Sequence, residues 1–315
     1  MKDNVSANAG KFSDPDLTAN GQKRARVALK ALQTLWFNTG SLCNITCVNC
    51  YLESSPQNDA LVYLSADEVS DYLDQIDATN SPVREIGFTG GEPFMNPEMT
   101  RMARRALARG YHVLILTNAM RPMMRPKIQE DLKALQAEYG HKLTLRVSLD
   151  HFSPAHHDAL RGKGGFERSL EGMRWLRDHG INMAVAGRSL WEESQADSRA
   201  GFAGLFAREG FKINAYDPAQ TVLFPEMDMS VPVPEITTKC WDILGKSPDE
   251  VMCASSRMVV KRKGAEKPSV LACTLLPYDL RFELGQSLAQ ASVDIPLNHP
   301  HCAKFCVLGG ASCSG

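Results

Sequence analysis

Three cysteines constrain this chain more than any other feature of its sequence. Cys43, Cys47 and Cys50 follow one another at the spacing C-x3-C-x2-C, within residues 40–51. Thiolates this close in sequence can converge on one face of a loop, and a cluster of four irons takes four ligands, usually cysteine thiolates. Three protein ligands leave one iron with an open position, which a catalytic metal site needs. We therefore interpret the triplet as ligands of a [4Fe-4S] cluster.

Zinc is the alternative metal for such a triplet. A C-x2-C pair is common in zinc sites, which take four ligands. A fourth Cys or His would be expected nearby, and none occurs between Tyr51 and His112. The triplet alone favours iron and sulfide over zinc without excluding zinc.

Cysteine number and composition limit the other possibilities. The nine cysteines are an odd count, and the first 26 residues are polar and lack the apolar core of a signal peptide. Both features argue against a disulfide framework and predict a reducing, cytoplasmic setting. A net charge of -1 gives no basic field for nucleic acid. No run of 18 apolar residues occurs, so we expect no membrane partner.

Strand and helix patterns alternate along the first two thirds of the chain. The capping box Ser65–Glu68 begins one of the helices. Strands are expected at residues 34–39, 84–89, 111–116, 143–149, 181–186 and 211–215. Helices are expected at residues 22–35, 65–77, 98–109, 128–139, 166–179 and 198–209. Such alternation predicts parallel strands joined by right-handed crossovers, and six units fall short of the eight of a closed barrel. The predicted fold is α/β, a partial (β/α)6 TIM-like barrel.

The pattern also predicts domain boundaries. We expect a flexible lead-in at residues 1–26 and the barrel at residues 27–217. Four prolines fall within 17 residues after Asp217, so residues 218–239 are interpreted as a linker. Residues 240–315 hold six cysteines and few periodic segments, which is typical of a small module built around metal.

Polar residues follow two of the expected strands. Gly90-Gly91-Glu92-Pro93 closes the second strand, and its glycines allow backbone to approach a ligand closely while Glu92 can accept from an ammonium group. Ser148 and Asp150 end the fourth strand, and Arg161 lies 13 residues beyond Ser148. A hydroxyl and a guanidinium can together hold a carboxylate.

The cysteine triplet, the Gly90–Pro93 turn and the Ser148–Arg161 segment together resemble the motifs of the radical S-adenosylmethionine (radical SAM) superfamily. The segment from Ser148 to Gly162 resembles members related to peptide maturases and molybdopterin-precursor cyclases. The resemblance implies that the Gly90–Pro93 motif holds the amino group of S-adenosylmethionine and that Ser148 and Arg161 hold its carboxylate. Asp150, in the same segment, is also expected in the cofactor site. Many members carry an aromatic residue before the third cysteine. Here Asn49 takes that place and Tyr51 follows the cysteine, so we expect these two residues beside the adenine.

The later cysteines resemble a further part of some members of this superfamily. Cys253 and Cys273 flank an expected hairpin, and Cys302, Cys306 and Cys313 follow at C-x3-C-x6-C. The arrangement resembles the SPASM or "twitch" region, which binds auxiliary iron–sulfur clusters. Two fully cysteine-ligated clusters would need eight cysteines, so we expect one auxiliary cluster held from among these five. Cys240 is expected to be a buried thiol that binds no metal. The alternative to an auxiliary cluster is a zinc site in this region, to which His299 and His301 could contribute.

The resemblance implies an enzyme. A cellular one-electron reductant would reduce the cluster, S-adenosylmethionine would split to a 5′-deoxyadenosyl radical, and the radical would abstract hydrogen from a peptide or small-molecule substrate. Two non-enzymatic classes stay open: an iron–sulfur electron-transfer protein and a structural zinc protein. In either of these, the motifs at Gly90–Pro93 and Ser148–Arg161 would have no function.

Overall fold

A computed structural model describes residues 10–225 and 231–310 of the chain. Its centre is one nine-stranded sheet in the order β10-β9-β8-β2-β3-β4-β5-β6-β7. The strands span Thr34–Asn38 (β2), Glu85–Thr89 (β3), His112–Thr117 (β4), Leu143–Ser148 (β5), Asn182–Ser189 (β6), Thr221–Pro225 (β7), Ser256–Val260 (β8), Ser269–Leu271 (β9) and Glu283–Gly285 (β10). All neighbours from β8 to β7 are parallel, and β9 and β10 are antiparallel. The α/β fold with an open, partial barrel is confirmed.

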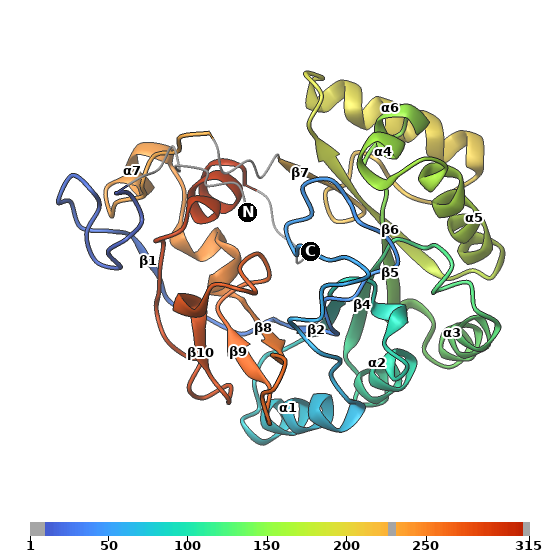
Figure 1. The fold of residues 1–315 in the computed structure, drawn as a ribbon, viewed down its shortest axis with the longest axis horizontal. Helices are drawn as coiled ribbons and strands as arrows, with labels where there is room; N and C mark the ends of the chain where they lie inside the picture. The colour runs from blue at the N-terminus through green and yellow to red at the C-terminus, as the bar shows by residue number, and fades with distance from the viewer. Residues whose placement is uncertain (1–9, 226–230, 311–315) are drawn as a thin grey trace.

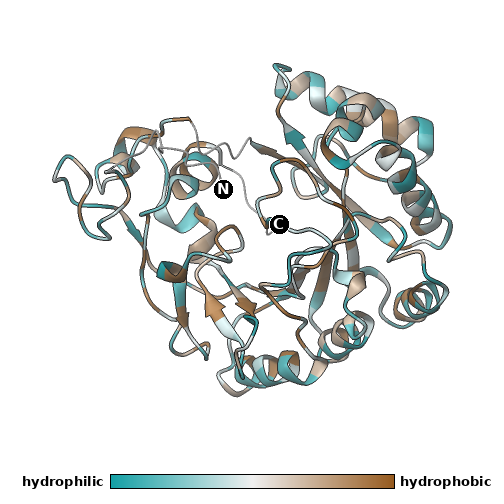
Figure 2. Cartoon of the chain, in the orientation of Figure 1, coloured by the Kyte–Doolittle hydropathy of each residue, from teal (hydrophilic) through white to brown (hydrophobic). Residues whose placement is uncertain are grey.

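Helices cover the outer side of the curved sheet (Figure 1). They span Ala66–Ala78 (α1), Met99–Ala108 (α2), Pro126–Tyr139 (α3), Pro154–Arg161 (α4), Gly165–Asp178 (α5) and Gln195–Glu209 (α6). The short helix Cys240–Leu244 (α7) lies apart from them, in the C-terminal region. Short helical turns span Pro93–Met95 (η1), Gly140–Lys142 (η2), Pro248–Glu250 (η3), Met252–Ala254 (η4) and Leu280–Phe282 (η5), and a π-helix spans Cys302–Leu308 (η6). The capping box at Ser65 and Glu68 begins α1 as expected. Hydrophobic and hydrophilic residues alternate along these helices, as amphipathic packing requires (Figure 2).

The strands present alternate residues to the two sides of the sheet. On β5, Leu145 and Val147 are fully buried in the core between the sheet and its helices. Arg146 and Ser148, the residues between and after them, line a pocket on the inner side. This period of two places polar groups inside the barrel while apolar groups hold the helices. On the same inner side, the Trp36 ring fills the space that a Cβ at Gly87 would need.

Two expected elements were wrong. No helix forms over residues 22–35, where the short strand Arg26–Val27 (β1) pairs with Ile295–Pro296 (β11) and coil then leads to β2. Tertiary contacts override the helical pattern, because Ala25 and Val27 are buried in a second core cluster. The sixth strand is β7, not residues 211–215. Residues 211–215 form a loop, and its alternating side chains Phe211, Ile213 and Ala215 are buried in the core. β7 lies inside the stretch interpreted as a linker.

The C-terminal region, residues 231–310, packs around this second cluster. The expected hairpin is confirmed, since β8 and β9 pair antiparallel. The N-terminal segment lies against the same region: the fully buried Arg24 forms an ion pair with Glu235 at 2.6 Å and donates to the carbonyl of Leu297 at 3.2 Å. Within the described residues, no helix is both long and apolar enough to cross a bilayer.

Candidate functional site: a cysteine loop above the sheet

The cysteine loop leaves the carboxyl end of β2 and is held there by the turn after β3. Gly91 donates its backbone N–H to the carbonyl of Gly40 at 2.8 Å, and Glu92 donates to the carbonyl of Leu42 at 3.1 Å. A Cβ on Gly91 would lie 2.1 Å from the Leu42 oxygen, and Gly90 adopts a φ of +139°. Only glycine permits this approach. The two glycines therefore set the path of the chain into Cys43.

A single pocket opens where this loop meets the strand ends. The three cysteines line it, together with most of the predicted cofactor residues. Those residues are Asn49, Tyr51, Gly90, Gly91, Ser148, Asp150 and Arg161. Glu92 and Pro93 are buried and are not part of the lining.

Glu92 is used inside the protein. Its carboxylate accepts from the Thr117 hydroxyl at 2.8 Å and from the backbone N–H groups of Asn118 at 2.8 Å and Phe94 at 3.2 Å. Burial raises the pKa of Glu92 to about 7, against the opposing effect of these hydrogen bonds. The side chain thus fixes the end of β4 against the turn after β3. Asn118 itself lines the pocket and donates from Nδ2 to the Asn44 side chain at 2.9 Å.

Arg161 and Asp150 form a buried, two-pronged ion pair in the pocket wall. Nε of Arg161 lies 2.6 Å and its Nη2 lies 3.0 Å from the two carboxylate oxygens. Burial disfavours the charged carboxylate, yet the pKa of Asp150 stays below its ordinary value because Arg161 is so close. Asp150 orients the guanidinium, and the backbone N–H of Arg188 donates to the Asp150 carbonyl at 2.9 Å. The pocket therefore presents a rigid cation at one side of the cysteine loop.

Burial acts on two of the three thiols. Burial raises the pKa of Cys43 to about 12 and also raises that of Cys47, although the charge of Arg161 opposes the shift at Cys47. A metal must therefore displace protons when it binds. A structural zinc site takes four Cys or His ligands, whereas the lining of this pocket supplies three cysteines and no histidine. Three thiolates suit a four-iron cluster with one open iron, so this donor set fits a cluster better than structural zinc.

The later cysteines gather in a second, smaller cavity. Cys253, Cys273, Cys302 and Cys306 line it with His301, and the remaining lining is apolar. Burial, with the neighbouring thiols, raises the pKa of Cys302 well above its ordinary value. Cys313 lies outside the described residues. The expectation of a buried Cys240 was wrong, because this residue is only half-buried on the short helix α7. Cys240 does not line the cavity, and its sulfur accepts from the backbone N–H of Thr237 at 3.3 Å.

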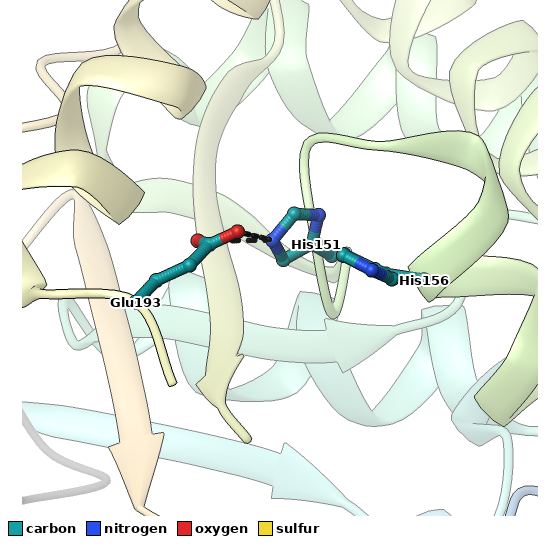
Figure 3. Close-up of side chains that lie close together, drawn as sticks. All are labelled: His151, His156 and Glu193. Atoms are coloured by element: carbon teal, nitrogen blue, oxygen red, sulfur yellow. Dashed lines mark hydrogen bonds and ion pairs between the residues drawn. The ribbon is translucent and has the colours of Figure 1, made fainter. Parts of the chain in front are cut away.

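A third group of possible ligands lies one residue beyond Asp150. His151, His156 and Glu193 have ligand atoms within 4.8 Å of one another (Figure 3). Ser153 donates its backbone N–H to Nδ1 of His151 at 2.9 Å, so the neutral ring carries its proton on Nε2. That proton points to Glu193, 3.2 Å away. Neither nitrogen of His151 has a lone pair left for a metal, and the group is a hydrogen-bonded link between the loops after β5 and β6.

Sequence analysis missed the inner wall of the pocket. Arg146, Leu116, Phe224, Leu275 and Phe305 line it. The alternation along β5 could have placed Arg146 beside Ser148. Leu275 and Phe305 come from the C-terminal region, and only the fold brings them to this pocket.

Comparisons with known proteins agree with this geometry. Residues 37–188 match the family model described as "Radical SAM superfamily". The chain is 32% identical over 181 residues to the antilisterial bacteriocin subtilosin biosynthesis protein AlbA of Bacillus subtilis, covering 56% of this chain and 37% of that protein. It is 31% identical over 174 residues to an AdoMet-dependent heme synthase of Methanosarcina barkeri, covering 54% and 47%. The chain thus spans less than half the length of these relatives.

Solved structures share the fold. Streptococcus suis SuiB superposes with a TM-score of 0.58 at 12% identity, over 81% of this chain and 63% of that one. The structure described as native anSMEcpe with bound AdoMet gives 0.56 at 13% identity, over 82% and 80%. At such low identity these matches support the architecture alone.

Proposed function

Because the chain belongs to the radical SAM superfamily of enzymes through residues 37–188, we propose that the cysteine loop holds a [4Fe-4S] cluster and that the adjoining pocket binds S-adenosylmethionine. The observation that carries the proposal is the shared pocket: Cys43, Cys47 and Cys50 face the same space as Ser148 and Arg161. When bound, the cluster and cofactor supply one-electron reductive cleavage and hydrogen-atom abstraction.

The protein's own residues bind and orient. Arg161, fixed by Asp150, and the Ser148 hydroxyl would hold the cofactor carboxylate. Backbone groups of Gly90 and Gly91 would face its amino group. Glu92 would hold this turn against the end of β4 through its hydrogen bonds from Thr117 and Asn118. This modifies the expected role of Glu92, whose carboxylate already has three donors. Asn49 and Tyr51 remain the proposed neighbours of the adenine.

The substrate would lie against the inner wall. Phe224, Leu275 and Phe305 make this wall apolar, with Arg146 among them. We favour a peptide over a small molecule. SuiB has been solved bound to precursor peptide SuiA, with a TM-score of 0.53 to this chain, and the B. subtilis relative is a bacteriocin biosynthesis protein. The heme synthase relatives keep a small molecule as the second candidate. A cellular one-electron reductant and a cytoplasmic setting complete the proposal.

The second cavity would hold one auxiliary cluster. Its four described cysteines, Cys253, Cys273, Cys302 and Cys306, suffice for a fully ligated cluster without Cys313. The assignment of residues 240–315 to an auxiliary module stays part of this proposal, with the addition that β8 and β9 extend the barrel sheet.

The decisive test is anaerobic purification, reconstitution with iron and sulfide, metal counting and incubation with S-adenosylmethionine and dithionite. We expect about eight irons per chain, as two four-iron clusters require, and release of 5′-deoxyadenosine. About four irons with cleavage would remove the auxiliary cluster from the proposal. Bound zinc without cleavage would overturn the whole assignment.

A second test addresses the substrate class. Deuterium-labelled cell extract is separated into a peptide fraction and a small-molecule fraction, and each is supplied to the reconstituted enzyme. We expect deuterium in 5′-deoxyadenosine from the peptide fraction. Transfer from the small-molecule fraction alone would contradict a peptide substrate, and Cys47→Ala provides the blank.

A further inference from the structure

A tyrosine of the C-terminal region donates a hydrogen bond to the cysteine loop. Tyr278 donates its hydroxyl to the carbonyl of Leu52 at 2.8 Å, and the same oxygen accepts from Nδ2 of Asn58 at 3.1 Å. Leu52 is buried, lies two residues after Cys50 and lines the cofactor pocket. A side chain more than 200 residues away along the chain therefore fixes the exit of the loop.

Asn58 connects this exit to the entrance of the loop. Its Nδ2 also donates to the carbonyl of Glu53 at 2.8 Å, and its backbone carbonyl accepts from the Ser41 hydroxyl at 2.9 Å. Cys43 in turn donates its backbone N–H to the carbonyl of Ser55 at 3.0 Å. The two ends of the cysteine loop thus share one hydrogen-bond network, and the Tyr278 hydroxyl joins the exit of the loop to the C-terminal region.

The segment carrying Tyr278 also reaches the second cavity. Cys273, Leu275 and Leu276 line that cavity, and Leu275 lines the cofactor pocket as well. Within residues 273–278, the chain passes from a cysteine of the second site, along a side chain shared by both sites, to the bond on Leu52. A displacement of the chain at Cys273 could therefore reach the bond between Tyr278 and Leu52 through the shared side chain of Leu275.

We propose that Tyr278 is a positioning residue, which holds the cysteine loop in its metal-binding shape and couples that shape to the second cysteine site. The proposal deepens the proposed function and rests on it for the identity of the metal. Loss of the hydroxyl leaves the Leu52 carbonyl and Asn58 without this partner, so the loop gains freedom while the surrounding core keeps its packing.

Tyr278→Phe tests the idea, and Tyr72→Phe is its matched control. The Tyr72 hydroxyl also joins the barrel to the C-terminal region, through the carbonyls of Pro268 at 3.2 Å and Gln286 at 3.0 Å, on a helix and not at the cysteine loop. Both variants remove one hydroxyl from this contact between barrel and C-terminal region. Only Tyr278→Phe should affect residues 43–58.

The first readout is hydrogen exchange of the cluster-free chain. In Tyr278→Phe we expect the amides of residues 43–58 to exchange about fivefold faster, the effect of losing a typical hydrogen bond, with no change there in Tyr72→Phe. Equal exchange in wild type and Tyr278→Phe, or the same increase in both variants, would overturn the proposal. This readout needs no cluster, so failure of the wild type to take up iron would count against the proposed function alone.

The second readout is the electron paramagnetic resonance spectrum of the reduced, reconstituted enzyme during titration with S-adenosylmethionine. We expect Tyr278→Phe to need about fivefold more S-adenosylmethionine for the spectral change, because the free energy of the lost hydrogen bond would then lower the cofactor affinity. Tyr72→Phe should follow the wild type. An unchanged titration in Tyr278→Phe would show that the bond serves stability only and would refute the positioning role.

Discussion

The two cysteine sites of this chain have opposite surroundings. The cysteine loop faces a pocket in which an ion pair, hydroxyl and amide groups and glycine backbone stand opposite the apolar wall of Phe224, Leu275 and Phe305. The second site is a smaller cavity in which four cysteines and His301 meet aliphatic side chains and Phe282. One site offers three thiols and many polar groups; the other offers four thiols and almost no polar partner.

Under the proposed function, this difference would separate a site that admits a ligand from a site that encloses a metal. Three thiols leave a position open, and the polar wall supplies partners for a charged molecule in that position. Four thiols in an apolar cavity can complete a cluster and exclude solvent from it, which tunes its potential but leaves no place for substrate. Leu275 lines both cavities, so the two cysteine sites are separated by one side chain.

The largest effect is expected from Cys47→Ala. Loss of one of three ligands should empty the first site, so iron should fall from about eight to about four per chain and 5′-deoxyadenosine should no longer form. Iron counting and product chromatography measure both. Full cleavage of S-adenosylmethionine by this variant would contradict the comparison, because the cysteine loop would then not hold the catalytic cluster.

Cys306→Ala should affect the second site and spare the first. The second cluster should be lost, while cleavage of S-adenosylmethionine persists and turnover of the true substrate falls. Cys306 lines the second cavity and not the first. If cleavage disappears in a variant that still melts cooperatively, the second site is needed for the chemistry of the first.

Asp150→Asn probes the polar wall that the second site lacks. Breaking a buried ion pair leaves Arg161 uncompensated, so the free energy of unfolding of the cluster-free chain should fall by about 3 kcal/mol at pH 7. The folded-state pKa of Asp150 is below its ordinary value. The stabilisation is therefore present above the unfolded pKa and is lost as the pH falls below about 4.

Denaturant titrations at several pH values measure this dependence. Asp178→Asn is the control, because its ion pair with Arg177 is more exposed and should contribute little. A difference between wild type and Asp150→Asn that stays constant down to pH 3 would contradict the ion-pair explanation.

Gly91→Ala tests whether the loop depends on close backbone contact. The new methyl group would meet the Leu42 carbonyl, and neither backbone can yield cheaply. We expect a loss of about 1–3 kcal/mol in unfolding free energy and poor iron uptake at the first site. Gly204→Ala, on α6 with open space around it, should be neutral or slightly stabilising. Equal behaviour of the two variants would show that the glycine turn does not shape the loop.

The smallest effect is expected from His156→Ala. His151 uses both ring nitrogens in hydrogen bonds, so the group with Glu193 should bind no metal. The metal content of the reconstituted variant should equal that of wild type, as measured by elemental analysis. A missing equivalent of metal would reveal a third site and would show that the bond from Ser153 yields to coordination.

Sequence reasoning predicted the local features well. The cysteine spacing, the capping box at Ser65 and the strands that end at Thr89 and Ser148 all follow from short-range patterns. The site residues on these strand ends converge because parallel strands end at one edge of the sheet. The roles assigned to them remain predictions.

What the sequence did not predict depends on contacts between distant segments. The alternation of Phe211, Ile213 and Ala215 suggested a strand, yet these residues are buried from a loop, and β7 follows in a proline-rich stretch. The hydrogen bonds of Glu92 could not be predicted from its own motif, because Thr117 and Asn118, two of its three donors, lie 25 and 26 residues further along the chain. Leu275 and Tyr278 reach the first site only through packing of the C-terminal region.

The buried Arg24 has a consequence for how the chain is made. Its partners Glu235 and Leu297 are 211 and 273 residues away in sequence. The strands from β2 to β6 can pair with neighbours as they emerge from the ribosome, but Arg24 must wait until nearly the whole chain has been synthesised. The first segment to be translated is therefore expected to be among the last to reach its native place, and a chain stopped before Leu297 would leave it undocked.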